Sequence, residues 1–251
     1  MSSRRRALLG GAAALLLAAC VAQGPAALPE ASAEGPLPEP LEGRLWRLEP
    51  ARSLLQVLAF RQGALAAGLG HNHVLTAPRL QGWLQLPSDA SDPSRLSAAQ
   101  LARTRFALAL RLDELQLDDP AQRARLGPAF ASVLTAEAIA ATRANLLGES
   151  MLESARFPWL RVHSVQLLGE GAQVLAEVEL DWHGRQQRVR LPLQLSMEEP
   201  GGQVLRVQGR MALRLTDFGI RPLSLLGGML AVQDGIAVEL DLGLQKASPA
   251  P

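Results

Sequence analysis

The residues with the clearest capacity for chemistry are two histidines, His71 and His73, in the run Gly70-His71-Asn72-His73. In an extended segment, residues two apart point the same way, with Cβ atoms about 7 Å apart. This spacing suits two nitrogen ligands of one metal ion or haem. A third ligand would have to come from elsewhere, and the sequence brings none near. Alternatively, the two histidines cap a turn and hydrogen-bond locally.

The rest of the sequence carries no recognisable catalytic arrangement. It has no nucleophile elbow, no carboxylate pair at a justified spacing and no cofactor-binding loop. The tripeptide Asp217-Phe218-Gly219 occurs in kinases, but the glycine-rich phosphate loop, the strand lysine and the His-Arg-Asp element are missing. We therefore expect a protein that is not an enzyme and that needs no cofactor, unless the two histidines hold a metal ion or haem.

The only cysteine, Cys20, follows a typical export signal. Three arginines at positions 4–6 precede an apolar run, Leu8 to Ala19, that is too short to span a bilayer as a permanent helix. Leu17-Ala18-Ala19-Cys20 resembles a bacterial lipobox, in which the cysteine is acylated after cleavage. An ordinary signal peptide, and export by either the general or the twin-arginine route, remain alternatives. We expect a periplasmic lipoprotein, and Val21 after the cysteine favours the outer membrane.

Composition excludes some classes of partner. Of 251 residues, 48% are hydrophobic and 20% charged, so the chain can bury a core. Aromatic residues make up 4% and tyrosine is absent, which argues against a stacking surface for sugars or bases. Removal of residues 1–19 takes away three arginines and leaves 22 basic against 24 acidic residues, a net charge of −2. This balance gives no electrostatic reason to expect nucleic-acid binding.

The clearest structural pattern lies between Gln173 and Ser196. Apolar residues alternate with charged ones up to Trp182, and the alternation resumes after His183-Gly184. A period of two predicts two antiparallel strands with one apolar and one polar face. Similar patterns occur across the chain, in residues 80–86, 105–112, 157–168, 205–215 and 236–242. In residues 157–168 the alternation changes phase, which predicts a bulge.

One helical segment, Asp118 to Gly148, interrupts the strands. Asp119-Pro120 and Thr135 look like helix starts, and the second helix should end at Gly148. Because one helix cannot cover so many apolar faces, the strands must cover each other in a sandwich or a closed barrel. We assign residues 1–19 to the signal peptide, 20–43 to a flexible Pro/Ala-rich tether, 44–245 to one β domain and 246–251 to a disordered tail.

Four segments resemble the YceI-like family. They are Leu45 to Ser53, Leu152 to Leu160 with Phe157-Pro158, the hairpin Ala176 to Leu193, and Leu215 to Ile220. The resemblance implies a mainly β protein with an antiparallel, lipocalin-like barrel of about eight strands that binds polyisoprenoid lipids. Departures are the longer loop near Pro87 to Ala102, Glu49 in place of aspartate, and the lack of the family's pocket aromatics.

The resemblance implies an isoprenoid or other long-chain lipid as partner, held in the barrel lumen, with a membrane reached through the acyl anchor. The apolar faces then form the ligand wall: Leu84, Leu86, Phe106, Leu108, Leu110, Val178, Leu180, Trp182, Leu191, Leu193, Met211, Leu213, Val238 and Leu240. His71 and His73 would contact a lipid headgroup, in addition to the two possibilities above. The alternatives are a metal- or haem-binding redox protein that uses His71 and His73, and a solid-core interaction domain of the cell envelope.

Overall fold

The computed structural model describes residues 37–38, 40, 43–198 and 203–247. All of these residues belong to one compact unit. The predicted signal peptide, Cys20 and nearly all of the predicted tether lie outside the described residues. In the part of the chain that is described, no helix is both long enough and apolar enough to cross a membrane.

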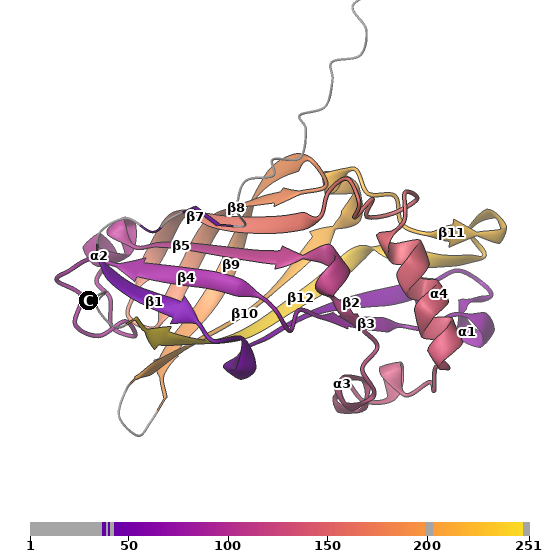
Figure 1. Cartoon of the computed structure of the whole chain (residues 1–251), viewed down its shortest axis with the longest axis horizontal. Helices are drawn as coiled ribbons and strands as arrows, with labels where there is room; N and C mark the ends of the chain where they lie inside the picture. The colour runs from indigo at the N-terminus through magenta and orange to yellow at the C-terminus, as the bar shows by residue number, and fades with distance from the viewer. Residues whose placement is uncertain (1–36, 39, 41–42, 199–202, 248–251) are drawn as a thin grey trace, which may run out of the picture. The chain divides into compact units, whose positions relative to one another are not determined.

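Eight antiparallel strands close into a barrel (Figure 1). In order around the barrel they are β1 (Arg44–Leu48), β4 (Gln81–Leu86), β5 (Arg105–Arg111), β7 (Trp159–Glu170), β8 (Gln173–Trp182), β9 (Arg185–Met197), β10 (Val204–Arg214) and β12 (Leu230–Lys246). The first and last strands close the ring, where Trp46 pairs with Lys246 and Leu48 with Leu244. The predicted barrel is therefore confirmed, and β12 extends to Lys246, the first residue assigned to the predicted tail.

Three strands are broken at one end of the barrel. β1 is followed by the 3₁₀ turn η1 (Pro50–Arg52), and β2 (Leu54–Gln62) then continues along β12. β3 (His73–Thr76) precedes β4 and pairs with β2, while β6 (Gln116–Leu117) follows β5 after η2 (Leu112–Glu114) and pairs with β3. The sheet β2-β3-β6 thus flares away from the ring. The end of the barrel with this extension is called the wide end below, and the other is the narrow end.

The pairing of β9 with β10 also stops before the wide end. It joins Met197–Leu193 to Leu205–Gly209 and goes no further. The N–H of Leu195 points toward the β8 side and donates at 2.8 Å to the O atom of Ala172, the residue before β8. Because successive N–H groups of a strand alternate in direction, an N–H at position 192 would point to β10. Residue 192 is proline and has no N–H to give. The hydrogen-bond ladder between β9 and β10 therefore ends at Pro192, and the two strands separate beyond it. The turn η4 (Leu215–Phe218) lies in the space between them, where Gln187 Nε2 donates to Asp217 O at 3.0 Å.

Local sequence signals explain the predicted hairpin and bulge. His183 and Gly184 have positive φ values of 55° and 70°, as a two-residue turn between twisted antiparallel strands requires. The register between β7 and β8 shifts between Ser164 and Gln166, which confirms the predicted bulge. β11 (Ser224–Leu225) pairs with the start of β12, and η5 (Leu226–Gly228) turns the chain between them.

The helices lie outside the barrel wall. α4 (Ala136–Leu147) starts at its cap Thr135 and ends at Gly148, and α3 (Pro120–Arg125) is capped by Asp119, which confirms both predicted helix starts. η3 (Pro128–Phe130) lies between them. Two helices were not predicted: α2 (Ala98–Arg103), which a capping box of Ser97 and Gln100 begins at the narrow end, and the single turn α1 (Ala66–Leu69).

Candidate functional site: an apolar barrel interior

The barrel encloses two apolar cavities. The larger, of about 140 Å³, lies toward the wide end, and every residue that lines it is hydrophobic. The smaller, of about 50 Å³, lies toward the narrow end; Thr104 is its only hydroxyl, and Thr104 Oγ1 already donates to Gln100 O at 2.9 Å. A polar group in either cavity would lose its hydrogen bonds to water without replacement. The interior can therefore accept apolar groups only.

A constriction separates the two cavities. Phe106, Leu108, Leu191 and Leu240 belong to the walls of both. These four side chains come from β5, β9 and β12, so they converge from opposite sides of the ring. The two cavities and the constriction between them are together called the channel below.

The structure places nearly all of the predicted ligand wall around these cavities. Around the larger cavity lie Phe106, Leu108, Leu110, Val178, Leu180, Trp182, Leu191, Met211, Leu213, Val238 and Leu240, and around the smaller one lie Leu84 and Leu193 as well. Leu86 is the exception: it is buried in the core at the narrow end and lines neither cavity. We therefore correct its place in the predicted wall. The binding role of the others stays a prediction.

Sequence reasoning missed the part of the wall that comes from outside the regular strands. At the wide end, Leu146 of α4 and the following Met151 and Leu152 close the larger cavity. The guanidinium of Arg143 donates to Leu115 O and Asp113 O, which ties α4 to the strand break after β5. α4 has no fully buried residue. The cavity is thus covered at this end by a helix that rests on the barrel through one edge.

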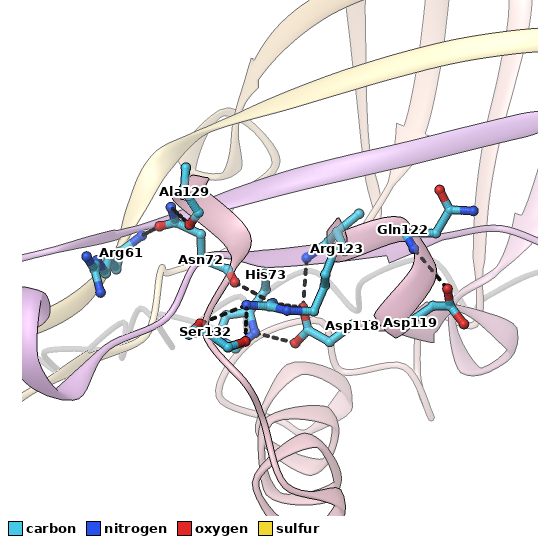
Figure 2. Close-up of polar contacts among 10 residues, drawn as sticks. Arg61, Asn72, His73, Asp118, Asp119, Gln122, Arg123, Ala129 and Ser132 are labelled. Atoms are coloured by element: carbon cyan, nitrogen blue, oxygen red, sulfur yellow. Dashed lines mark hydrogen bonds and ion pairs between the residues drawn. The ribbon is translucent and has the colours of Figure 1, made fainter. Parts of the chain in front are cut away.

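His73 belongs to a buried ion-pair network rather than to an open site (Figure 2). His73 Nδ1 lies 2.6 Å from Asp118 Oδ2, and Arg123 Nη1 donates to Asp118 Oδ1 at 2.6 Å. The Asp118 side chain is fully buried and that of Arg123 is 7% exposed. Arg123 also donates to Asn72 O at 2.8 Å and to Ser132 Oγ at 2.9 Å. The network thus fastens α3 and the segment before α4 to β3.

His71 lies apart from that network and faces positive charge. Burial first, and then the neighbouring His73, Arg123 and Arg61, lower the pKa of the His71 imidazole. The charges of Arg123 and Arg61 would repel a metal ion, whereas the charge of Asp118 acts in the opposite direction. Among the described residues, no group of three or more His, Cys, Asp or Glu side chains could hold a metal. His73 makes the local contact that the hydrogen-bonding interpretation predicts, and the metal or haem alternative stays a prediction.

The two other histidines are also far from a common site. His163 Nε2 lies 3.3 Å from Glu179 Oε1 on the neighbouring strand. The His183 ring packs on that of Phe157, with the ring centroids 4.7 Å apart, and its Nδ1 lies 3.2 Å from Phe218 O. Both histidines serve local contacts in the barrel wall and at the hairpin turn.

The Asp118 network predicts a specific pH dependence of stability. Burial alone would raise the pKa of the Asp118 carboxyl, but hydrogen bonds from His73 and Val74 N, with the charges nearby, outweigh it and hold the pKa below its usual value. As the pH falls, the Asp118 carboxylate therefore takes up a proton first in the unfolded chain, near the ordinary aspartate pKa of about 3.9, and only at lower pH in the folded chain. The stabilisation is therefore complete above that pH and is lost as pH falls through the lower, folded pKa.

Urea unfolding of the wild type and of Asp118→Asn over a pH series tests this expectation. The difference in free energy of unfolding between the two proteins should shrink as the pH falls below about 3.9. A difference that stays constant to the lowest measurable pH would contradict the assignment of the charge to Asp118.

Comparisons with known proteins agree with the fold. The YceI-like domain family matches residues 102–244. The crystal structure of BcnA from Burkholderia cenocepacia is similar, with a TM-score of 0.54 and 11% identity over 78% of this chain and 98% of that chain. A polyisoprenoid binding domain from Saccharophagus degradans, implicated in plant cell wall breakdown, gives a TM-score of 0.50 and 11% identity over 82% and 100% of the two chains. No curated protein sequence matches the chain.

Proposed function

The chain belongs to the YceI-like family, and on this premise we propose that it binds an isoprenoid or another long apolar chain inside its barrel, without catalysing a reaction. The observation that carries the proposal is the larger cavity, which lies within the barrel and is lined by hydrophobic residues alone. The structural neighbour from Saccharophagus degradans is described as binding polyisoprenoid, and this supports the ligand class.

The size of the cavities limits how such a ligand is held. An engineered cavity of about 150 Å³ in another protein binds benzene, so the larger cavity, at about 140 Å³, holds only a short segment of a chain. Longer ligands must pass the constriction at Phe106 and Leu191 into the smaller cavity, or displace α4 at the wide end. Each methylene that enters contributes about 0.8 kcal/mol. Affinity should therefore rise with chain length until the channel is full.

Isothermal titration calorimetry of residues 31–251 with geraniol, farnesol and geranylgeraniol tests the proposal. This fragment is the compact unit that contains all of the strand pairings described above. We expect affinity to increase along the series, with a negative heat-capacity change from apolar burial. The absence of binding by all three alcohols, with the fragment shown to be folded by circular dichroism, would refute it.

We also propose that the protein is a periplasmic lipoprotein of the outer membrane, anchored through Cys20. The support is the sequence alone, namely the lipobox-like Leu17-Ala18-Ala19-Cys20 after an apolar run. Mass spectrometry of the mature protein from a bacterial membrane fraction should find acylated Cys20 as its first residue, and Cys20→Ser should carry no acyl chain. A mature chain that starts elsewhere, with a free thiol, would contradict the anchor.

A further inference from the structure

Exposed hydrophobic side chains gather on two loops beyond the wide end of the barrel. Leu65 and Leu69 belong to the segment around α1, and Leu225, Leu226 and Met229 to the turn between β11 and β12; between 38% and 62% of each side chain is exposed. Among the described residues, the other exposed large hydrophobics are Val133 and Leu168. Leu65, Leu69, Leu225, Leu226 and Met229 are called the tip patch below.

The two loops of the tip patch are built as one unit. Leu65 N donates to Met229 O at 2.9 Å. Gly63, at a φ of 109°, lies so near that loop that a Cβ there would be 2.4 Å from Met229 O, so only glycine fits. Positive φ values at Leu226, Gly227 and Gly228 turn the second loop sharply. Figure 1 shows α1 and β11 at the same end of the molecule, beyond α4. The backbone thus holds these side chains outward, which leaves them exposed to solvent.

The two segments that carry the tip patch, 61–70 and 220–232, contain the basic residues Arg61 and Arg221 and no acidic ones. Arg61 donates to Gly70 O at 2.7 Å within its own loop, whereas Arg221 is exposed. Asp234, which follows the second segment, is engaged by Arg214 Nε at 2.9 Å and by Thr216. An apolar patch with basic residues at its edge complements an anionic lipid surface.

The tip patch is also continuous with the wall of the larger cavity. Leu230 follows Met229 and packs on Gly70, with its Cδ1 3.0 Å from the place that a Cβ of Gly70 would take. Val232, two residues further along β12, lines the cavity. An apolar chain that leaves a bilayer at the patch would therefore meet hydrophobic side chains on its way to the cavity.

We propose that the tip patch docks the barrel, wide end first, on an anionic phospholipid bilayer. The side chains of both loops enter the interface between headgroups and acyl chains, and Arg221 lies at the level of the phosphates. This goes beyond the proposed function, because a barrel that holds no ligand could still dock, and a barrel that fills from solution need not dock.

Vesicle co-sedimentation of residues 31–251, which lack Cys20, tests the docking. The probes are vesicles of phosphatidylglycerol with phosphatidylethanolamine, and vesicles of phosphatidylcholine alone. We expect binding to the anionic vesicles that is weaker at high salt. Leu225→Ser/Leu226→Ser should bind at least tenfold more weakly because two exposed leucines no longer enter the bilayer. Arg221→Gln should bind about fivefold more weakly. The matched control Leu168→Ser removes an exposed leucine of β7 near the narrow end and should bind like the wild type.

Each outcome of these experiments either supports or contradicts docking on the bilayer. Circular dichroism should show all variants folded, since the changed side chains are exposed. Equal vesicle binding by the wild type and Leu225→Ser/Leu226→Ser, or no binding by either, would overturn the docking. If the double variant instead abolished a dimer seen by analytical ultracentrifugation, without any vesicle binding, the patch would be an interface between copies and the proposal would be wrong. Calorimetry with geranylgeraniol on the same variant should be unchanged, so that failure of docking and failure of ligand binding are distinguished.

Discussion

Asp118→Ala is expected to lower the free energy of unfolding by about 3 to 5 kcal/mol, the usual cost of removing one partner from a buried ion pair. The Arg123 guanidinium would remain 7% exposed with no carboxylate beside it. Val74 N would also lose its acceptor, Asp118 Oδ1, at 3.0 Å. Asp118 has a φ of 56°, which aspartate tolerates better than alanine does, so backbone strain adds to the loss. Urea unfolding of residues 31–251 measures the effect.

Two further variants separate the charge from the backbone. Asp118→Asn keeps the shape and the tolerance for a positive φ but removes the charge, so its cost reports the ion pair. Asp118→Asn/Arg123→Met removes both charges and should recover part of the stability lost by Asp118→Asn alone. Limited proteolysis should cleave the segment between β6 and α4 faster in Asp118→Ala, because Arg123 fastens that segment to β3. A cost of less than about 1 kcal/mol for Asp118→Ala would place the network among weak surface ion pairs.

Val238→Phe is expected to weaken ligand binding roughly 100-fold while the barrel remains folded. Val238 is on β12 and lines the larger cavity, so the added ring occupies the space of the ligand. Displacement of three or four methylene groups at about 0.8 kcal/mol each removes about 3 kcal/mol of binding free energy, and every 1.4 kcal/mol is a factor of ten. Calorimetry with geranylgeraniol measures the change.

Thermal unfolding of the same variant distinguishes a hollow from a solid interior. In a cavity of about 140 Å³ the new ring has room, and stability should change little or increase. In a filled core it would cost about 1 to 3 kcal/mol by overpacking. Leu168→Phe is the control, because it places a similar ring on the outer face of β7. Unchanged ligand affinity in Val238→Phe would show that the ligand does not bind in the larger cavity.

The sequence predicts those parts of the fold that depend on neighbours along the chain. The hairpin of β8 and β9 follows from alternation and from His183-Gly184, and α4 follows from its cap Thr135. Because an inward face repeats every second residue, the same alternation predicts most of the cavity wall. It places Leu86 in that wall wrongly. A period of two shows which face of a strand a residue occupies, but it does not show where along the barrel axis a cavity ends.

Contacts between distant residues are what the sequence alone does not reveal. His73 and Asp118 are 45 residues apart, and only the pairing of β3 with β6 brings them together. Closure of the ring through β1 and β12 joins the two ends of the domain, so alternation could not decide between a barrel and a sandwich. The tip patch could not be predicted for the same reason. Nothing in the sequence indicates that Leu65 and Met229 are neighbours, and they are brought together because β2 runs beside β12.

The most direct test of ligand binding in the barrel is native mass spectrometry of residues 31–251, secreted into a bacterial periplasm and purified without detergent. We expect a stoichiometric adduct with the mass of an isoprenoid or another lipid. The adduct should be present in the wild type and in Leu168→Phe, and it should be strongly reduced in Val238→Phe. A bare polypeptide mass for the wild type, repeated after incubation with polyprenyl lipids, would contradict it.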